Sequence, residues 1–181
     1  MSADRQRERM SPPSLDLRDP AGWPSGHLGW AFPRRASFEG RAMTFLAAGA
    51  RRGEKLVYVA DDPRPGQWPP ELLERGHLVV ASTREVYGDA RRVEAELQRA
   101  TFEGMLAAAL SDGYTGIRVA ADNTSLIEGA ERLEAWLAWE AVADDFMAHH
   151  PVTGLCGFDR TRVDDGVLEH VMGRHDRVIG G

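Results

Sequence analysis

The sequence predicts an α/β fold: a mostly parallel sheet with helices on both faces, in three layers. Short apolar runs alternate with helical patterns along most of the chain, as in βαβ proteins. The clearest unit, residues 45–62, combines a helix end, a turn at Gly53, a buried strand, and the carboxylates Asp61 and Asp62. With 181 residues and 43% apolar side chains, the chain is long and apolar enough to form the hydrophobic core of one such α/β domain.

The predicted strands are the apolar or alternating runs that turn signals bound. They cover residues 27–32, 55–60, 77–82, 116–123 and 153–158, with a short edge strand at 177–179. Apolar residues at helical spacing predict helices over 38–49 (with Ser37 as N-cap), 71–75, 91–111, 129–149 and 164–173. We expect irregular connections at 61–70, which has four prolines, and at 83–90.

Residues 1–25 are polar and contain four prolines, which predicts a disordered N-terminal tail. Trp23 is the one residue of this tail that we expect to dock on the domain. Residues 26–181 then form a single domain without an internal repeat.

Composition excludes several classes of function. A net charge of −6 disfavours direct nucleic-acid binding, which uses a basic face. Cys156 is the only cysteine, so the chain has no internal disulfide and no cysteine cluster, and a reducing cytoplasm is the expected compartment. The absence of a long apolar run and the charged N-terminus predict neither a membrane span nor a signal peptide. The abundance of Ala, Arg and Gly is typical of a GC-rich bacterial genome.

Acidic side chains follow three of the predicted strands. They are Asp61 with Asp62, Asp122, and Asp159. Ligands of open α/β sheets bind beyond the carboxyl ends of the strands, so these carboxylates predict a site for a small molecule or a metal. Each aspartate can instead cap the next helix or form a turn.

Three further side chains have two interpretations each. Arg118 lies in an apolar strand, where it pairs with Asp122 or Asp61 in a pocket or leaves at a sheet edge. Glu140 lies among apolar helix residues and faces either the site or water. Cys156 is either a small core residue or a thiol in a sensing pocket.

No catalytic or metal set emerges from the spacing of residues. No serine or threonine lies in an elbow motif, and His27, His77, His170 and His175 have no ligand spacing, although His175 can fold back over the sheet. His149 and His150 are adjacent, so their side chains diverge on a helix. We therefore assign neither catalytic residues nor metal ligands, and no cofactor can be named.

A phosphate-binding loop is missing where an ATPase would have it. Between the first strand and the first helix the chain reads Pro-Arg-Arg-Ala-Ser at 33–37, without glycines, and the only lysine, Lys55, lies elsewhere. ATP hydrolysis by a P-loop is therefore not expected. Arg34 and Arg35 can hold an anion at the helix N-terminus or simply be solvated.

Several motifs, in order, resemble the MEDS sensory domain of DcmR-type regulators. They are Gly-His-Leu-Gly-Trp-Ala-Phe at 26–32, the spaced residues of 45–59, Asp-Gly-Tyr at 112–114, Arg-Val-Ala-Ala-Asp at 118–122, Trp139-Glu140, and Leu-Cys-Gly-Phe-Asp at 155–159. The resemblance covers about residues 27–178. It implies a relative of the RecA and KaiC ATPase fold that has lost its phosphate loop.

The resemblance also implies a site for small organic molecules such as hydrocarbon derivatives. The matched positions suggest as pocket residues His27, Trp30, Tyr58, Asp61, Arg118, Asp122, Glu140, Cys156 and Asp159. Gly29 and Phe32 depart from the family, which often has a cysteine and a tyrosine at these positions. DcmR-type proteins carry a DNA-binding domain, which this sequence does not show, so we expect action through an anti-sigma factor, a histidine kinase or another regulator.

Three functions fit these observations. The first is a cytoplasmic sensor that binds a small organic ligand and signals through a partner protein in transcriptional, sigma-factor or kinase regulation. The second is an enzyme that uses the strand-end carboxylates and His27 as acid and base. The third is a nucleotide-binding pseudo-ATPase that serves as a scaffold.

Overall fold

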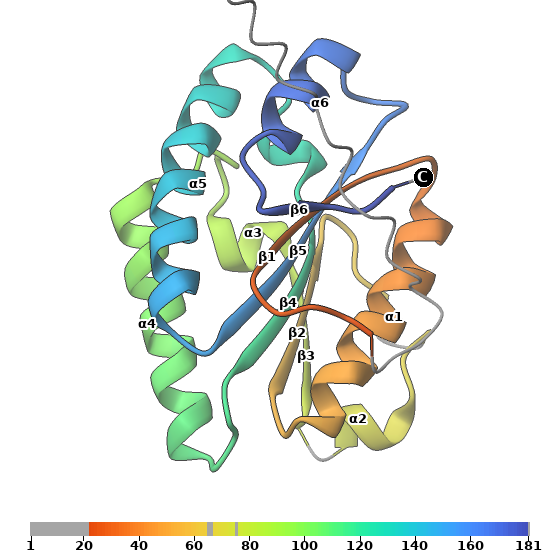
Figure 1. The fold of residues 1–181 in the computed structure, drawn as a ribbon, viewed down its shortest axis with the longest axis vertical. Helices are drawn as coiled ribbons and strands as arrows, with labels where there is room; N and C mark the ends of the chain where they lie inside the picture. Colours follow the sequence, from red (N-terminus) through yellow and green to blue (C-terminus); the bar gives the residue numbers. More distant parts are fainter. Residues whose placement is uncertain (1–21, 65–66, 75, 181) are drawn as a thin grey trace, which may run out of the picture.

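A six-stranded parallel sheet forms the centre of the protein (Figure 1). The computed structural model describes residues 22–64, 67–74 and 76–180. The strands are β1 (His27–Phe32), β2 (Lys55–Ala60), β3 (Leu78–Ser82), β4 (Ile117–Asp122), β5 (Val152–Asp159) and β6 (Arg177–Val178). Their order is β3-β2-β4-β5-β1-β6, and the neighbours pair in parallel.

Helices cover both faces of this sheet. They are α1 (Arg35–Arg51), α2 (Pro70–Glu74), α3 (Thr83–Tyr87), α4 (Ala95–Ser111), α5 (Ala130–His149) and α6 (Asp165–Met172), with a 3-10 turn at Thr124–Leu126. Figure 1 shows α1 and α2 on one face and α4 and α5 on the other. The expected three-layer α/β arrangement is therefore confirmed.

Each face of the sheet has its own apolar core because side chains alternate along the strands. Val57 and Val119 pack with α4 and α5, whereas Leu56 and Tyr58 pack with α1. The α1 layer lies very close to the sheet: a Cβ on Gly157 would be 2.3 Å from the Phe38 ring. This division into two faces decides which candidate residues can meet.

The predicted strands and the long helices agree with the structure to within a few residues, with three differences. Helix α1 begins at Arg35, with Arg34 as its N-cap residue in place of Ser37. The expected connection 83–90 contains α3, which Ser82 and Glu85 start with a capping box. Helix α4 begins at Ala95 instead of 91, and Arg91 itself has a φ of 53°, outside the right-handed helical region.

Trp23 docks on the domain, as the sequence suggested. It is 1% exposed, its ring lies edge-on to Phe45 at 5.1 Å between centroids, and its carbonyl accepts a hydrogen bond from Arg52. The rest of the predicted tail up to residue 21 lies outside the described residues. Among the described helices, none is long and apolar enough to cross a membrane.

Candidate functional site

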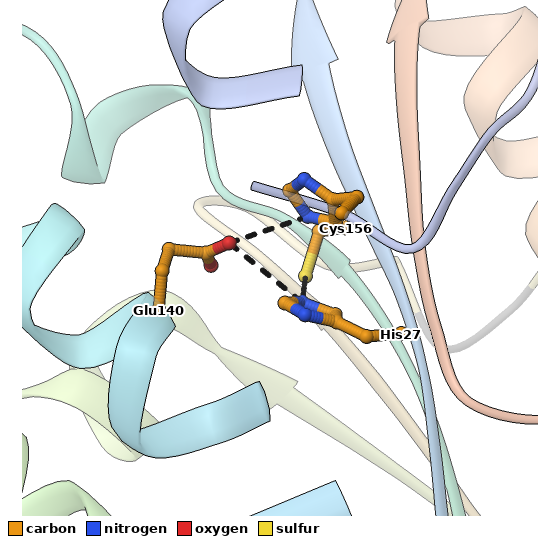
Figure 2. A group of neighbouring side chains, drawn as sticks. His27, Glu140 and Cys156 are labelled. Carbon is orange, nitrogen blue, oxygen red and sulfur yellow. Dashed lines mark hydrogen bonds and ion pairs between the residues drawn. The ribbon is translucent and has the colours of Figure 1, made fainter. Parts of the chain in front are cut away.

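A buried cluster of four titratable side chains lies between the sheet and α5. It consists of His27 from β1, Glu140 from α5, Cys156 from β5 and His175, which follows α6. Figure 2 shows that the side chains of His27, Glu140 and Cys156 point toward one another from these three elements. One ligand atom from each of the four residues lies within 4.8 Å of the others.

His27 lies close to one thiol and two carboxylates. Its Nε2 lies 3.4 Å from Cys156 Sγ and 3.8 Å from Glu140 Oε2. Its Nδ1 is hydrogen-bonded to the carboxylate of Asp144, one turn after Glu140 on α5. His27 is 1% exposed, so these contacts are largely shielded from solvent.

The strand pattern explains why His27 and Cys156 meet. Strands β1 and β5 are neighbours, with His27 opposite Gly154 and Gly29 opposite Cys156. Residues two apart point to the same face of a strand, so the His27 and Cys156 side chains both face α5. Glu140 projects from that helix, which also carries the buried side chains of Trp136 and Trp139.

His175 completes the cluster because Gly29 leaves room for its ring. A Cβ on Gly29 would lie 2.7 Å from Cγ of His175, so any larger residue displaces the imidazole. The ring lies 4.3 Å from that of His27 between centroids, and Nε2 is 3.5 Å from Glu140 Oε2. Gly29 and the His175 ring are therefore packed directly against each other.

Burial favours the uncharged form of each titratable group in the cluster and shifts its pKa accordingly. It raises the pKa of Glu140 to about 7 and raises that of the Cys156 thiol. Burial and neighbouring His27 lower the pKa of His175 to about 3. Burial also lowers the pKa of His27, but Cys156, Asp144 and Glu140 outweigh it, so the net shift is upward.

Three polar atoms of the cluster have no hydrogen-bond partner among the described residues. They are both carboxylate oxygens of Glu140 and Nε2 of His175. A buried carboxylate without a donor is costly, so a proton, a water molecule, a ligand or an ion has to satisfy it. The described residues therefore do not form a closed hydrogen-bonded network in this cluster.

An apolar cavity adjoins these polar groups. It has a volume of about 20 Å³, and its aromatic walls are Tyr87, Phe102, Trp136 and Trp139. A larger hollow of about 340 Å³ between α3 and α4 opens on the other side of Tyr87, which lines both. Tyr87 therefore contacts both the inner cavity and the outer hollow.

Trp30, Tyr58 and Arg118 lie on the opposite face of the sheet, under α1. The first two belong to the aromatic core around Phe38. Arg118 is fully buried and pairs with Glu54 at 2.5 Å, not with Asp61 or Asp122, and it lies in the interior of the sheet rather than at an edge. The sheet therefore separates this group from the His27 cluster.

The strand-end aspartates lie at the same edge of the sheet, and each accepts a hydrogen bond from a neighbouring hydroxyl group. Ser125 donates to Asp61 at 2.7 Å, and Thr124 donates to Asp122 at 2.6 Å. Asp159 accepts hydrogen bonds from the backbone and hydroxyl of Thr161 at 2.9 and 2.7 Å. The bonds of Asp122 and Asp159 are the turn-forming interactions that short acidic residues make after a strand, whereas Asp61 bonds to a distant segment of the chain.

Asp144 and the place of His175 in the cluster did not follow from the sequence. A signal for Asp144 was present, since a residue four positions after Glu140 shares its helix face. For His175 the signal is weaker, because nothing in a short segment after α6 shows where the chain turns back. Glu140 is 1% exposed, which decides between its two interpretations in favour of the site.

A comparison with family models decides the family. Residues 26–176 match the model described as MEDS, the methanogen/methylotroph, DcmR sensory domain. The chain belongs to the MEDS family. The resemblance expected from the sequence motifs is confirmed, and a sensory role comes with the family. No curated protein matches the MEDS chain.

A solved structure shares the fold of this MEDS domain, and a second one is similar to it at a lower score. The flagellar accessory protein FlaH from Methanocaldococcus jannaschii is 12% identical, with a TM-score of 0.59 over 87% of this chain and 71% of that one. The cytoplasmic domain of the type VII secretion ATPase EccC from Thermomonospora curvata is 14% identical over 88% of this chain and 20% of that one, with a TM-score of 0.45. The expected RecA/KaiC-like fold class is confirmed, and the phosphate loop is absent from the sequence at 33–37.

Proposed function

We propose that this MEDS domain senses a small organic molecule in the cavity between α5 and the sheet. The observation that carries the proposal is the pairing of aromatic walls with buried, unpartnered polar atoms of Glu140 and His175. Ligand sites are typically apolar hollows with a few polar groups that orient the ligand. The ligand class is a molecule with a short apolar body and one polar end.

The size of the cavity connects binding to signalling. A volume of about 20 Å³ holds little more than one water-sized group, so a ligand of several carbon atoms has to move the walls. Those walls belong largely to α4 and α5, through Phe102, Trp136 and Trp139. Ligand binding then favours a conformer in which these two helices are displaced.

In this proposal a cytoplasmic protein partner, such as an anti-sigma factor, a histidine kinase or a regulator, reads the displaced conformer. A cytoplasmic location keeps the Cys156 thiol reduced. Tyr87 controls entry, because it lies between the outer hollow and the inner cavity.

The alternative in which His27 acts with strand-end carboxylates loses its support. His27 pairs with Gly154 near one end of β5, and Phe32 pairs with Asp159 at the other end. Five residues of strand separate His27 from that end, which is about 16 Å. This distance is far beyond the reach of a hydrogen bond.

A matched pair of valine substitutions on α5 tests the cavity. Ala143 lines it and is buried, whereas Ala141 is exposed on the same helix, so both variants carry the same loss of helix propensity. A thermal-shift screen of small alcohols, aldehydes and haloalkanes is expected to raise Tm in the wild type and in Ala141→Val but not in Ala143→Val. Hydrogen exchange in α4 and α5 should change with the same ligands.

Two results contradict the proposal. One is that none of the compounds raises Tm or binds in calorimetry. The other is that Ala143→Val binds a ligand as well as Ala141→Val does, which would place the site elsewhere.

A further inference from the structure

The four polar side chains at the end of this cavity have the donor set of a transition-metal site. They offer two imidazole nitrogens, one thiol sulfur and one carboxylate oxygen, and all four residues are buried. Two neutral histidines with a thiolate and a carboxylate carry two negative charges, which balance a divalent cation. Imidazole and thiolate together favour zinc over calcium or magnesium, which prefer oxygen ligands.

The spacing of the donor atoms fits a tetrahedral ion. Bonds of about 2.0–2.3 Å to zinc place the donors of a tetrahedron about 3.3–3.8 Å apart. Nε2 of His27 lies 3.4 Å from the Cys156 sulfur and 3.8 Å from Glu140 Oε2, and Nε2 of His175 lies 3.5 Å from the same oxygen. The remaining pairs are within 4.8 Å, so small side-chain shifts close the set around one ion.

The outer ring nitrogens of both histidines are held as they are in metal sites. Nδ1 of His27 is hydrogen-bonded to the Asp144 carboxylate, and Nδ1 of His175 donates to the carbonyl oxygen of Val171 at 3.1 Å. A metal-bound histidine almost always makes such a contact through its other nitrogen, which orients the ring and leaves the inner nitrogen free to bind. Here both inner nitrogens point to the centre of the cluster.

We propose that His27, Glu140, Cys156 and His175 bind one divalent transition-metal ion, with zinc as the best fit. An ion at this place satisfies Oε2 of Glu140 and Nε2 of His175 together, which otherwise have no hydrogen-bond partner among the described residues. The inference rests on the proposed function in placing the ion at the polar end of the same cavity. The ion then holds β1, β5, α5 and the segment after α6 together at the wall that the ligand has to displace.

Metal uptake by tag-free full-length protein tests this directly. After removal of metal with a chelator, native mass spectrometry and zinc titration are expected to show one equivalent bound per chain. Cobalt should give the visible bands of a tetrahedral ion and a near-ultraviolet thiolate-to-cobalt band. Because Cys156 is the only cysteine, that band identifies the ligand without any substitution.

Substitutions then assign the other ligands. We expect His175→Gln and Cys156→Ser to lower zinc affinity at least 100-fold, and Asp144→Asn to lower it by about 10- to 100-fold as the loss of a supporting contact. His149→Gln, an exposed histidine on α5, serves as the control and should bind as the wild type does. Circular dichroism shows which variants remain folded. If the variants do not fold, the cobalt spectrum of the wild type still shows whether Cys156 binds the metal.

The outcomes separate the two proposals. Wild-type protein that takes up neither zinc nor cobalt, or a cobalt complex without the thiolate band, overturns the metal site. Metal uptake in protein that binds none of the organic compounds leaves the metal site standing and removes the sensing pocket. If the protein binds an organic compound but takes up no metal ion, the sensing pocket stands and the metal site is overturned.

Discussion

Replacing Gly49 with alanine tests whether Arg118 is a structural residue of the α1 layer. A Cβ at this position would lie 2.6 Å from Cδ and 2.8 Å from Nε of Arg118, and 2.8 Å from Glu54 Oε2. These distances are too short for atoms that are not bonded, so the buried Arg118–Glu54 pair has to move. Arg118 also lies over the Phe45 ring at 4.6 Å, which limits the direction of that movement.

The expected change in the free energy of unfolding of Gly49→Ala results from two opposing effects. Alanine in a helix interior is more favourable than glycine by about 0.5–1 kcal/mol. Overpacking costs about 1–3 kcal/mol, and breaking a buried ion pair costs about 3–5 kcal/mol. The Glu54 side chain is 14% exposed, so water recovers part of the second cost. We expect Gly49→Ala to lower the free energy of unfolding by about 2–3 kcal/mol.

Urea denaturation followed by tryptophan fluorescence measures this difference. Gly104→Ala on α4 is the control, because nothing lies within 4 Å of its added Cβ, and it should gain about 0.5–1 kcal/mol. If Gly49→Ala is as stable as Gly104→Ala, the guanidinium does not pack against α1. Arg118 would then be free to contact a ligand, and the assignment to the α1 core would be wrong.

Three further substitutions test the site and its surroundings. Gly29→Ala places a Cβ 2.7 Å from His175 and should lower zinc affinity by about 10- to 100-fold in a competition titration. Gly40→Ala, which has open space around its Cβ, is the control and should bind zinc as the wild type does. Equal affinities of the two variants would show that His175 is not a ligand. Ser82→Ala removes the cap of α3 and should cost about 0.5–2 kcal/mol in urea denaturation; no loss would mean that the capping box is absent in solution. Trp139→Ala should lower the free energy of unfolding by about 3–5 kcal/mol. In the thermal-shift screen it should bind larger compounds better than the wild type does. An unchanged preference would show that the Trp139 ring is not a wall of the cavity.

The sheet and the long helices could be predicted because their signals are local. Apolar runs bounded by glycine turns gave β1 and β2 at their observed bounds. The start of α4 could not be predicted in this way, since the left-handed backbone at Arg91 has no signature in a residue that is not glycine. The capping pair Ser82 and Glu85 was visible in the sequence, but a five-residue helix is too short for apolar periodicity to show.

The cluster was predicted only in part because its members come from four separate segments. His27, Glu140 and Cys156 were each named as candidates, but their meeting depends on β1 lying beside β5 and on α5 covering that pair. Neither pairing nor helix placement follows from spacing along the chain. Residue spacing also gives no signal for a proposed metal site of this kind, because spacing indicates only ligands that share one loop or helix.

The position of the cluster bears on function more than its composition does. Ligands of open α/β sheets usually bind beyond the strand ends, where they can enter without separating the layers. Here the aspartates at that edge are engaged with Ser125, Thr124 and Thr161, whereas the carboxylate oxygens of Glu140 and Nε2 of His175, which have no hydrogen-bond partner among the described residues, lie between α5 and the sheet. A molecule that reaches them has to separate a helix from the sheet. In the proposed sensor, binding energy is therefore coupled to a change in the packing of α5 on the sheet, so that the ligand shifts the population toward the changed conformer.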